Sequence, residues 1–393
     1  MPQAERDVIF STIFNREQRK LHRDLHRFSR EQIAPLLAEM HEKEEIPQEL
    51  IKKIRRRKLF GIGIPERYGG RGGGLISACI RDEALGYGSG AVGLFVGIPA
   101  GVTASTILFA GTEKQKQIWA RQIASGTIGT FQLTEPDRGS DTDVRSTVKI
   151  NERNATLSGN KIFVTNGKLG KFGVIIARTP HPTINGKFQH VAVIVPDIAK
   201  YIGEKHARKM GLRSSHTSTF HYDEVPLSLN HVLGLKRGIG KGRKYAFMAL
   251  DKSRVTLSAI ALGMAQRAYD ETRSGYEKQV NRGMLGPKQM EHRSSLIAEM
   301  KTSIEAMRRQ IYTVAAEYAP TRGFSGNAIS AKIFASRALN DVIHKGMEVV
   351  GTDAYNETHP LGILSLDAKV FEIFEGANEA IRAALARQLT EKK

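Results

Sequence analysis

Short runs of β-branched residues are confined to the middle of the chain, between about Phe131 and His231. Three of them, residues 161–165 (KIFVT), 173–177 (GVIIA) and 190–195 (HVAVIV), lie between turn-forming residues. Such runs are typical of β-strands. We therefore expect a mostly antiparallel sheet or barrel in this part of the chain, and only there.

The segment before this region carries apolar residues at helical spacing. Between residues 21 and 124 they recur three and four positions apart, and the pattern is interrupted at Pro47 and at the glycine-rich residues 69–74. The first periodic residues are Phe28, Ile33, Leu36, Leu37 and Met40. This pattern predicts a bundle of helices.

Long helices are predicted again after Gly242. One of them carries apolar residues at alternating spacings of three and four, which is a heptad-like seam that requires a partner helix. The seam consists of Ile297, Met300, Ile304, Met307, Ile311, Val314 and Tyr318. We interpret its methionines as core residues rather than ligands.

The chain has 393 residues, more than one hydrophobic core usually organises. We expect an α+β multidomain fold, with a helical domain at residues 1–128, a β domain at 129–240 and a C-terminal helical bundle at 241–393. Strands do not alternate with helices, which argues against a doubly wound nucleotide fold. Residues 238–242 (GIGKG) also lack the preceding strand and the glycine spacing of a dinucleotide fingerprint.

The cysteine content and the apolar pattern restrict the compartment and the metal chemistry. Cys79 is the single cysteine, so an intrachain disulfide and a thiolate zinc site are excluded. Residues 137–143 are acidic but lack the sixth-position glycine and the closing glutamate of a calcium loop. We expect no metal, no secretory signal and no transmembrane segment, and a cytoplasmic location, with the mitochondrial matrix open for a mature chain.

The charge is strongly basic, with 59 Lys and Arg against 40 Asp and Glu, a net charge of +19. This excess predicts a polyanionic partner, and nucleic acid, an acidic membrane, a phosphorylated cofactor or an acidic protein would each fit. Two segments concentrate the cations: residues 52–58 (KKIRRRK) and residues 236–244 (KRGIGKGRK). Either segment could instead be a solvated face.

Residues 133–141 (LTEPDRGSD) open the strand region and are dense in hydroxyl groups and glycine. Short side chains let backbone N–H groups approach a phosphate or the polar edge of a ring. The alternative is a turn between two domains, stabilised by its Asp and Ser side chains.

Five separated motifs resemble the acyl-CoA dehydrogenase family in order and spacing, over nearly the whole chain. They are residues 133–141 (LTEPDRGSD), 161–167 (KIFVTNG), 209–214 (KMGLRS), 251–254 (DKSR) and 374–379 (FEGANE). The resemblance implies a helical domain, a middle antiparallel β-barrel or sheet and a C-terminal four-helix bundle. It also implies FAD between the β domain and the C-terminal helices, and assembly as a homotetramer or homodimer.

The resemblance implies that Glu375 is the base that removes the substrate α-proton. Composition alone would favour a solvated glutamate at a helix end. A weakly acidic carbon needs a desolvated base and hydrogen bonds to the thioester oxygen, which by similarity come from the backbone N–H of Glu375 and a flavin ribityl hydroxyl. Some relatives place the base at the position of Ser253, which cannot serve here.

The other implied site residues fall into a cofactor set and a substrate set. The cofactor set is Phe131, Leu133, Thr134, Gly139, Ser140, Phe163, Thr165, Arg282, Leu285, Glu348, Gly351, Thr352, Ala377 and Glu379. The substrate set is Ser140, Arg243, Asp251, Arg254 and Gly376. Arg254 could alternatively be a helix-surface arginine. The chain departs from the family pattern at Phe163, Leu285, Glu348, Thr352, Leu366 and Ala377.

The implied activity is FAD-dependent dehydrogenation of an acyl-CoA to the trans-2-enoyl thioester, with electrons passed to an electron-transferring flavoprotein. The basic charge would also suit a thioester of acidic acyl carrier protein. A nucleic-acid-associated flavoprotein of the same fold is a more distant alternative. The resemblance implies that Gly93, Gly97 and Pro99 belong to the helix that lines the acyl tail, where such small residues would leave the bottom of the pocket open.

Overall fold

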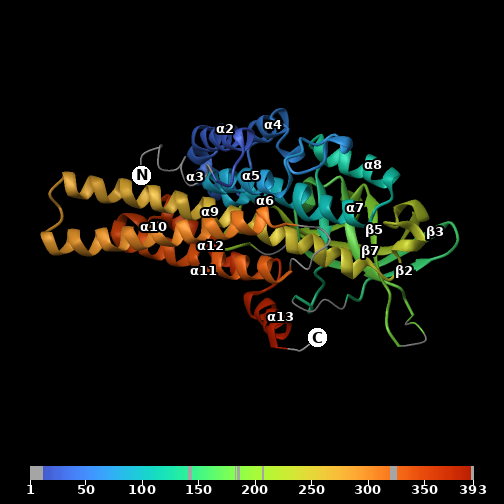
Figure 1. Cartoon of the computed structure of the whole chain (residues 1–393). Coiled ribbons are helices and arrows are strands. Elements are labelled where there is room, and N and C mark those ends of the chain that lie inside the picture. The colour runs from blue at the N-terminus through green and yellow to red at the C-terminus, as the bar shows by residue number, and fades with distance from the viewer. Residues whose placement is uncertain are drawn as a thin grey trace.

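The computed structural model describes residues 12–139, 144–181, 183, 186–205, 208–318 and 325–390. The molecule is elongated: long helices form one end and a β-sheet forms the other, as Figure 1 shows. In chain order it consists of a helical region, a sheet region and a second helical region, as the sequence pattern predicts.

The N-terminal region is made of short and medium helices. They are α2 (Arg16–Gln32), α3 (Leu37–Lys43), α4 (Gln48–Arg56), α5 (Gly74–Gly88), α6 (Gly90–Ile98), α7 (Ala104–Ala110) and α8 (Glu113–Ala124). Two begin with reciprocal capping boxes, at Asn15 and Thr112, whose side chains accept from the backbone N–H three residues on. A π-helical turn, η4 (Pro99–Thr103), separates α6 from α7.

The middle region is a curled sheet of seven strands. They are β1 (Gly129–Gln132), β2 (Thr147–Ile150), β3 (Asn154–Thr165), β4 (Phe172–Arg178), β5 (His190–Pro196), β6 (Ile202–Lys205) and β7 (Thr217–Ser228). The order is β1-β4-β2-β3-β7-β6, and β5 pairs with β4. Most pairs are antiparallel, as predicted, but β4 is parallel to both β1 and β2. The parallel pairing of β1 and β4 aligns Phe131 with Val174.

The C-terminal region contains the longest helices, α9 (Gly242–Asn281), α10 (Pro287–Ala316) and α11 (Ser325–Val350). Two shorter helices follow, α12 (Pro360–Ala368) and α13 (Asn378–Thr390). The predicted seam on α10 is confirmed: Met300, Ile304 and Met307 are fully buried in the core. In Figure 1, α13 projects from the side of the bundle opposite α2 and α4.

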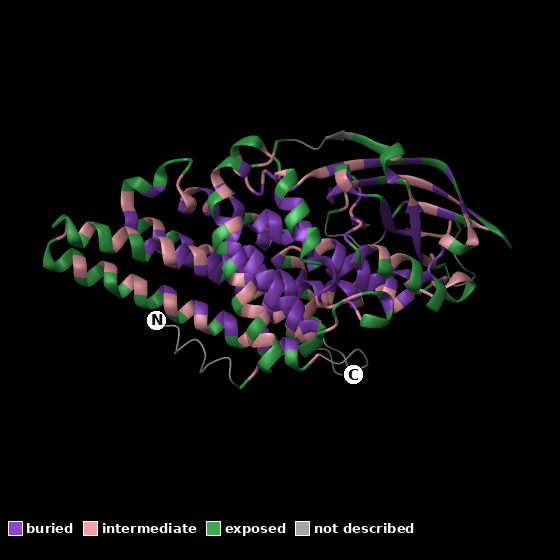
Figure 2. Ribbon diagram, turned by 90° about the horizontal axis from the view of Figure 1, so that it is seen from above, coloured by how far each residue is buried: buried purple, intermediate pink, exposed green. Residues whose placement is uncertain are grey.

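A shared core joins the two helical regions. Figure 2 shows the buried residues concentrated in the middle of the molecule, whereas the helical tip is largely exposed. Glycines let α5 and α9 cross closely: a Cβ at Gly86 would lie 2.3 Å from the Ile260 carbonyl oxygen, and one at Gly263 would lie 2.0 Å from that of Glu83. The two helices therefore pack backbone to backbone.

One stretch of the described residues, Gly90–Ala110, is long and apolar enough to cross a membrane. Its most apolar window is 83% buried within the fold. Such burial is common for the core helix of a globular domain, so the stretch is weak evidence for a membrane span.

Candidate active site

Glu375 lies in the short connection before α13, and its backbone is strained. Its φ is 53° and that of Gly376 is 99°, so two successive residues are left-handed. A Cβ at position 376 would lie 2.5 Å from Ile381 Cγ2, which leaves room only for glycine. Strain of this kind in a non-glycine residue occurs preferentially at functional sites.

The Glu375 carboxylate is held on one side only. Ser253 Oγ, on α9, donates a 2.6 Å hydrogen bond to Oε1. The other oxygen, Oε2, is buried and has no hydrogen-bond partner among the described residues. Burial raises the pKa of Glu375 to about 7, and the Ser253 hydrogen bond only partly opposes this effect. The group is therefore a desolvated base near neutral pH, with one oxygen available to a ligand.

Arg254 fixes the backbone of the base. Its side chain is buried, with 4% of the residue exposed, and Nε donates to the Glu375 carbonyl oxygen at 3.1 Å. Nη1 donates to Asp251 Oδ1 at 2.5 Å, and Ser325 Oγ donates to the same oxygen at 3.1 Å. Arg254 is thus not a surface arginine, and the structure places both predicted substrate residues, Asp251 and Arg254, beside Glu375.

Lys332, on α11, is a part of the site that sequence reasoning missed. It is fully buried, and Nζ donates to the Gly376 carbonyl oxygen at 2.8 Å and to Asn378 Oδ1 at 2.9 Å. Burial lowers the pKa of Lys332 to about 8. The sequence does contain a signal for this residue, because Lys332 lies on the apolar face of a predicted helix. An ammonium group is rarely buried without polar partners, so a lysine at such a position indicates a polar site.

The end of β1 and the following loop form a wall next to α9. Phe131 and Leu133 pack against the small core cluster that contains Val102, Ala249 and Leu250. Ala249 and Leu250 precede Ser253 by about one helical turn. The structure therefore brings the predicted flavin-edge residues of the sheet close to the helix that holds the base.

The loop after β1 is fixed by a buried ion pair. Glu135 accepts from Lys161 Nζ at 2.7 Å, from Ser146 Oγ at 2.6 Å and from the backbone N–H of Arg145 and Ser146. Burial opposes the charge of Glu135, but Lys161 and Ser146 outweigh it and hold the pKa of this carboxyl below its usual value. These bonds fix the described part of the loop at Glu135.

Phe163 presents an aromatic surface beside this loop. Its backbone is left-handed, with a φ of 56°, and 53% of the residue is exposed. The neighbouring Ile162 N–H donates to the Thr134 carbonyl oxygen at 3.0 Å, so Thr134 and Phe163 lie close together. Thr165 follows at the end of β3. An exposed aromatic ring in a strained backbone fits a planar ligand such as a flavin ring.

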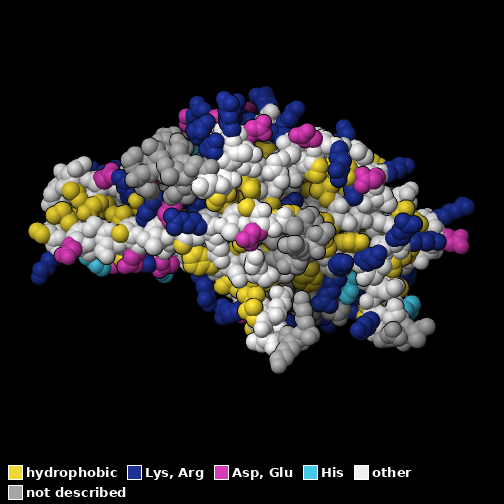
Figure 3. Space-filling model, in the orientation of Figure 1, with side chains coloured by type: hydrophobic (Ala, Val, Ile, Leu, Met, Phe, Trp, Pro, Cys, Tyr) yellow, Lys and Arg dark blue, Asp and Glu magenta, His cyan; other side chains and the backbone are white. Residues whose placement is uncertain are grey.

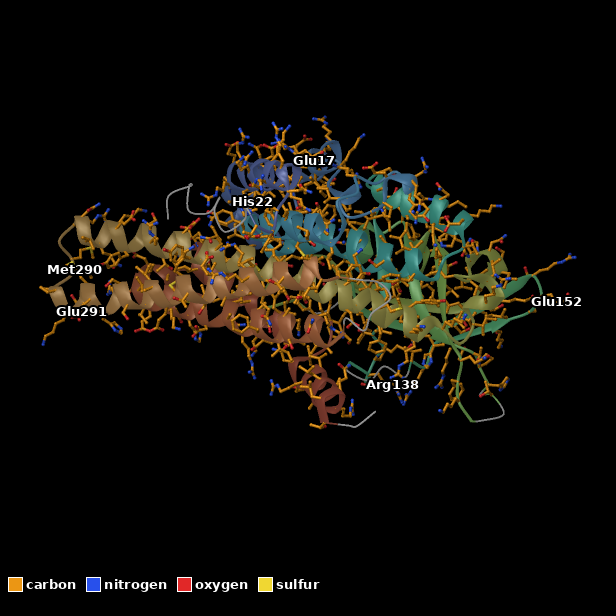
Figure 4. The ribbon with its side chains drawn as sticks, in the orientation of Figure 1. Glu17, His22, Arg138, Glu152, Met290 and Glu291 are labelled. Atoms are coloured by element: carbon orange, nitrogen blue, oxygen red, sulfur yellow. The ribbon has the colours of Figure 1, made fainter. Side chains whose placement is uncertain are left out.

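The remaining loop residues lie at the edge of this wall. Gly139 is exposed, and a Cβ there would have no atom within 4 Å. Figure 4 shows Arg138 on the side of the molecule from which α13 projects. Ser140, predicted for both the cofactor and the substrate, lies outside the described residues.

A second group of predicted cofactor residues lies far from Glu375, where α9 and α11 end. Arg282 caps the C-terminus of α9 and is exposed, and Leu285 is in the turn to α10. Glu348 is exposed, with Oε1 2.9 Å from His292 Nε2. Gly351 and Thr352 follow α11. Figure 4 labels Met290 and Glu291, at the start of α10, at the outer tip of the bundle.

The remaining predicted residues surround the base or the start of α9. Ala377 is half-buried and Glu379 is exposed on α13. Arg243 is exposed near the start of α9, with its guanidinium 5.6 Å from the centre of the Phe247 ring. The cations at 236, 237, 241 and 244 are exposed as well. We call these five exposed cations at positions 236, 237, 241, 243 and 244 the basic rim.

Two further polar groups lie on the N-terminal helices. The cations of residues 52–58 are all exposed, and Figure 3 shows Lys and Arg side chains gathered over α2 and α4. His22, His26 and Glu83 have ligand atoms within 4.8 Å of one another, a possible cation group that the sequence analysis did not predict. Glu83 already accepts from Arg308 at 3.1 Å, and this neighbouring positive charge disfavours a metal ion there.

Comparison with known proteins agrees with this architecture over the length of the chain. Family models of the acyl-CoA dehydrogenase N-terminal, middle and C-terminal domains match residues 15–127, 130–225 and 240–390. A short-chain specific acyl-CoA dehydrogenase of Clostridium acetobutylicum is 30% identical over 376 residues, which cover 95% of this chain and 98% of that protein. An acyl-CoA dehydrogenase of Bacillus subtilis is 32% identical over 383 residues, covering 94% and 96%.

A solved structure gives the same result. Butyryl-CoA dehydrogenase from Megasphaera elsdenii superimposes with a TM-score of 0.88 at 28% identity, covering 96% of this chain and 99% of that chain. The matched domains and the helix–sheet–helix fold are those of an FAD-dependent oxidoreductase. The chain belongs to the acyl-CoA dehydrogenase family.

Proposed function

We propose that the enzyme removes the α-proton and the β-hydride of an acyl thioester and forms the trans-2-enoyl thioester. The observation that carries this proposal is the Glu375 carboxylate, which Ser253 holds through Oε1 and whose buried Oε2 has no hydrogen-bond partner among the described residues. A base with a pKa near neutral pH combines a large deprotonated fraction with enough basicity to take a proton.

The surrounding residues keep this base in one position. Arg254 and Lys332 bond the backbone carbonyls of Glu375 and Gly376, which holds the left-handed turn against its own strain. In this proposal the backbone N–H of Glu375 donates to the thioester oxygen as negative charge develops there. The turn that carries the base is therefore held by two side chains from neighbouring helices.

The wall formed by Phe131, Leu133, Thr134, Phe163 and Thr165 fits FAD, because it presents an exposed aromatic face and a loop fixed by Glu135. When bound, FAD supplies the acceptor for the hydride. Phe163 offers an aromatic surface to the ring but no indole N–H. The acidic Glu348 in the distant group would repel a phosphate, so we expect Arg282 to provide most of the attraction there.

The partners follow from charge and from the distance between the two groups of cofactor residues. We propose coenzyme A as the carrier, with acyl carrier protein as the alternative that the basic rim favours. An electron-transferring flavoprotein is the proposed electron acceptor. The distant group, with Arg282, would then complete the FAD site of a second copy in a homodimer or homotetramer.

The test is the absorbance spectrum of the FAD-loaded protein, followed anaerobically with a panel of acyl-CoAs. We expect bleaching of the flavin band by at least one saturated acyl-CoA. Glu375→Gln should keep the flavin and lose reduction by about 10²–10⁴-fold or more. Glu372→Gln, a nearby carboxylate paired with Lys369, is the matched control and should bleach normally. Near-normal reduction in Glu375→Gln would refute the assignment.

A further inference from the structure

Lys332 is a buried ammonium group whose hydrogen-bond acceptors are both neutral. The residue is 1% exposed, and Nζ donates to the Gly376 carbonyl oxygen and to Asn378 Oδ1. Among the described residues, no carboxylate forms an ion pair with it. The buried Lys161, by contrast, pairs with Glu135 at 2.7 Å. A charge buried without an ion-pair partner is costly, so Lys332 needs a reason beyond packing.

The partners of Lys332 are held in place by α11 itself. Asn378 Nδ2 donates to Ser336 Oγ at 2.9 Å, and Ser336 Oγ donates to the Ile333 carbonyl oxygen at 3.2 Å. These bonds orient the Asn378 amide so that Oδ1 faces Lys332. Ser336 lies about one turn after Lys332 on α11, so one face of this helix holds both ends of the turn between Gly376 and Asn378.

The turn itself does not require a positive charge. The two acceptors of Lys332 are a backbone carbonyl oxygen and a side-chain amide oxygen, and the NH2 group of a neutral glutamine can donate to two such oxygens. A neutral donor would also avoid the cost of burying a charge. The ammonium group therefore indicates an electrostatic task that is separate from holding the turn.

Three charged groups face Lys332 from the surrounding elements. Burial lowers the pKa of Lys332, and the charge of Glu375 is the largest opposing effect. Arg254 lowers this pKa further, and Glu372 raises it. Arg254 and Glu372 are each already in an ion pair, at 2.5 and 2.6 Å. Glu375, like Lys332, forms no ion pair among the described residues, so the ammonium and the base are each other's counter-charge.

The groups that face the base agree with this relationship. Burial raises the pKa of Glu375, and the Asp82 carboxylate on α5 adds to this effect. The Ser253 hydroxyl, the Arg254 guanidinium and the Lys332 ammonium lower this pKa. Because Arg254 also binds a carboxylate of its own, Lys332 is the cation whose charge is not otherwise balanced. In a buried site such a charge acts more strongly than it would in water.

We propose that Lys332 is a positioning residue of the reaction, whose buried ammonium group is the counter-charge that keeps Glu375 ionised and able to accept the α-proton. This inference rests on the proposed function and adds a residue to the same site. Lys332 acts through the base and not on the substrate. With a pKa of about 8, the ammonium group stays largely charged at the pH near 7 where Glu375 loses its proton.

The test measures the ionisation of Glu375 directly, by infrared difference spectra of the FAD-loaded protein across pH without substrate. The carboxylic acid band that is absent from Glu375→Gln reports the protonated base, and its midpoint in the wild type should lie near pH 7. Lys332→Gln keeps a donor for the turn but removes the charge, so the midpoint should rise by about one unit or more. Lys369→Gln, which removes an exposed lysine before the base, is the matched control. An unchanged midpoint in Lys332→Gln would overturn the proposal.

Two further measurements separate the charge from the fold. Ser336→Ala releases the Asn378 amide but keeps the ammonium group, so the midpoint should stay at its wild-type value, and a shift as large as that of Lys332→Gln would overturn the proposal. If Lys332→Gln does not fold, Glu375→Gln tests the pair from the other side, because the coupling is reciprocal. One lysine that titrates near pH 8 in the wild type should then titrate at lower pH, as followed by NMR of ¹³C-labelled lysine side chains. Unchanged lysine titrations would also overturn the proposal.

The two levels of the inference fail in different ways. A wild type whose flavin no acyl-CoA bleaches would refute the proposed function and this inference with it. An unshifted midpoint in Lys332→Gln, in an enzyme whose wild type does bleach, would refute only the role of Lys332.

Discussion

Ser253 and Glu375 are joined by a 2.6 Å hydrogen bond that links the middle of α9 to the turn before α13. The bond fixes one carboxylate oxygen and leaves Oε2 as the buried oxygen without a partner among the described residues. The position at which some relatives place a base is thus occupied here by a residue that orients the base. This division of roles can be tested directly.

Ser253→Ala should shift the pH dependence of flavin reduction to higher pH. The hydroxyl stabilises the charged form of Glu375, so its loss raises a pKa that is already about 7. A hydrogen bond to a charged group contributes about 1.5–3 kcal/mol, which corresponds to a shift of roughly 1–2 pH units. The rate at pH 7 should therefore fall and recover in alkali. Ser253→Thr keeps the hydroxyl and should keep the wild-type profile, and coinciding profiles for all three proteins would exclude this role.

Glu375→Gln should stabilise the folded protein in alkali. A folded-state pKa of about 7, above the ordinary value of 4.5, means that the folded state binds the proton more tightly than the unfolded state. The wild type therefore loses stability as pH rises from about 4.5 to 7, by at most about 3 kcal/mol. The variant lacks this loss. Thermal unfolding should separate the two proteins at pH 8 but hardly at pH 4.5, and an equal difference at both values would contradict the linkage.

Arg282→Ala should weaken both flavin retention and the oligomer. If Arg282 reaches the FAD pyrophosphate of a second copy, a charge-assisted contact worth roughly 1.5–3 kcal/mol is lost. Gel filtration with detection of flavin absorbance measures both effects. Lys278→Ala, an exposed cation one turn earlier on α9, is the control. A monomeric wild type that holds a full complement of flavin would show that the distant group is not a cofactor site.

Replacing Lys236, Arg237 and Lys241 by Ser should raise the apparent KM at low salt and leave the maximal rate of flavin reduction unchanged. These cations of the basic rim act on association, because exposed charges steer an anionic carrier without touching the reacting atoms. The difference should shrink with added salt, since screening at 0.15 M operates over about 8 Å. If the KM of the variant equals that of the wild type at every salt concentration, the basic rim does not attract the anionic carrier.

The order of the regions was predictable because periodicity depends on local spacing. The apolar seam of α10 became a buried face, as its three and four spacing indicates, since Met300 and Ile304 have no exposed surface. The parallel pairing of β1 with β4 was not predictable, because a local sequence pattern identifies a strand but not the strand with which it pairs. The same limit applies to α9, whose packing on α5 depends on Gly86 and Gly263 meeting across the interface.

The site was predictable at the level of motifs but not of contacts. The motif located Glu375 but gave no indication of its left-handed backbone or of Lys332, which comes from a helix more than forty residues earlier in the chain. Arg254 was expected to meet the substrate carrier, and the structure gives it bonds to Glu375 and Asp251. Spacing assigns a side chain to a helix face, but only packing decides what that face meets.

The length of α9 has a consequence for oligomers that contain two different variant chains. Ser253 is in the middle of α9 and Arg282 caps its C-terminus 29 residues later (282 − 253), which at 1.5 Å per residue separates them by about 44 Å along the helix. If the far end of α9 serves the flavin of a neighbouring copy, a defect at one end and a defect at the other fall in different catalytic centres. Two inactive chains, one altered at Glu375 and one at Arg282, would then regain activity when they assemble together, as in intragenic complementation.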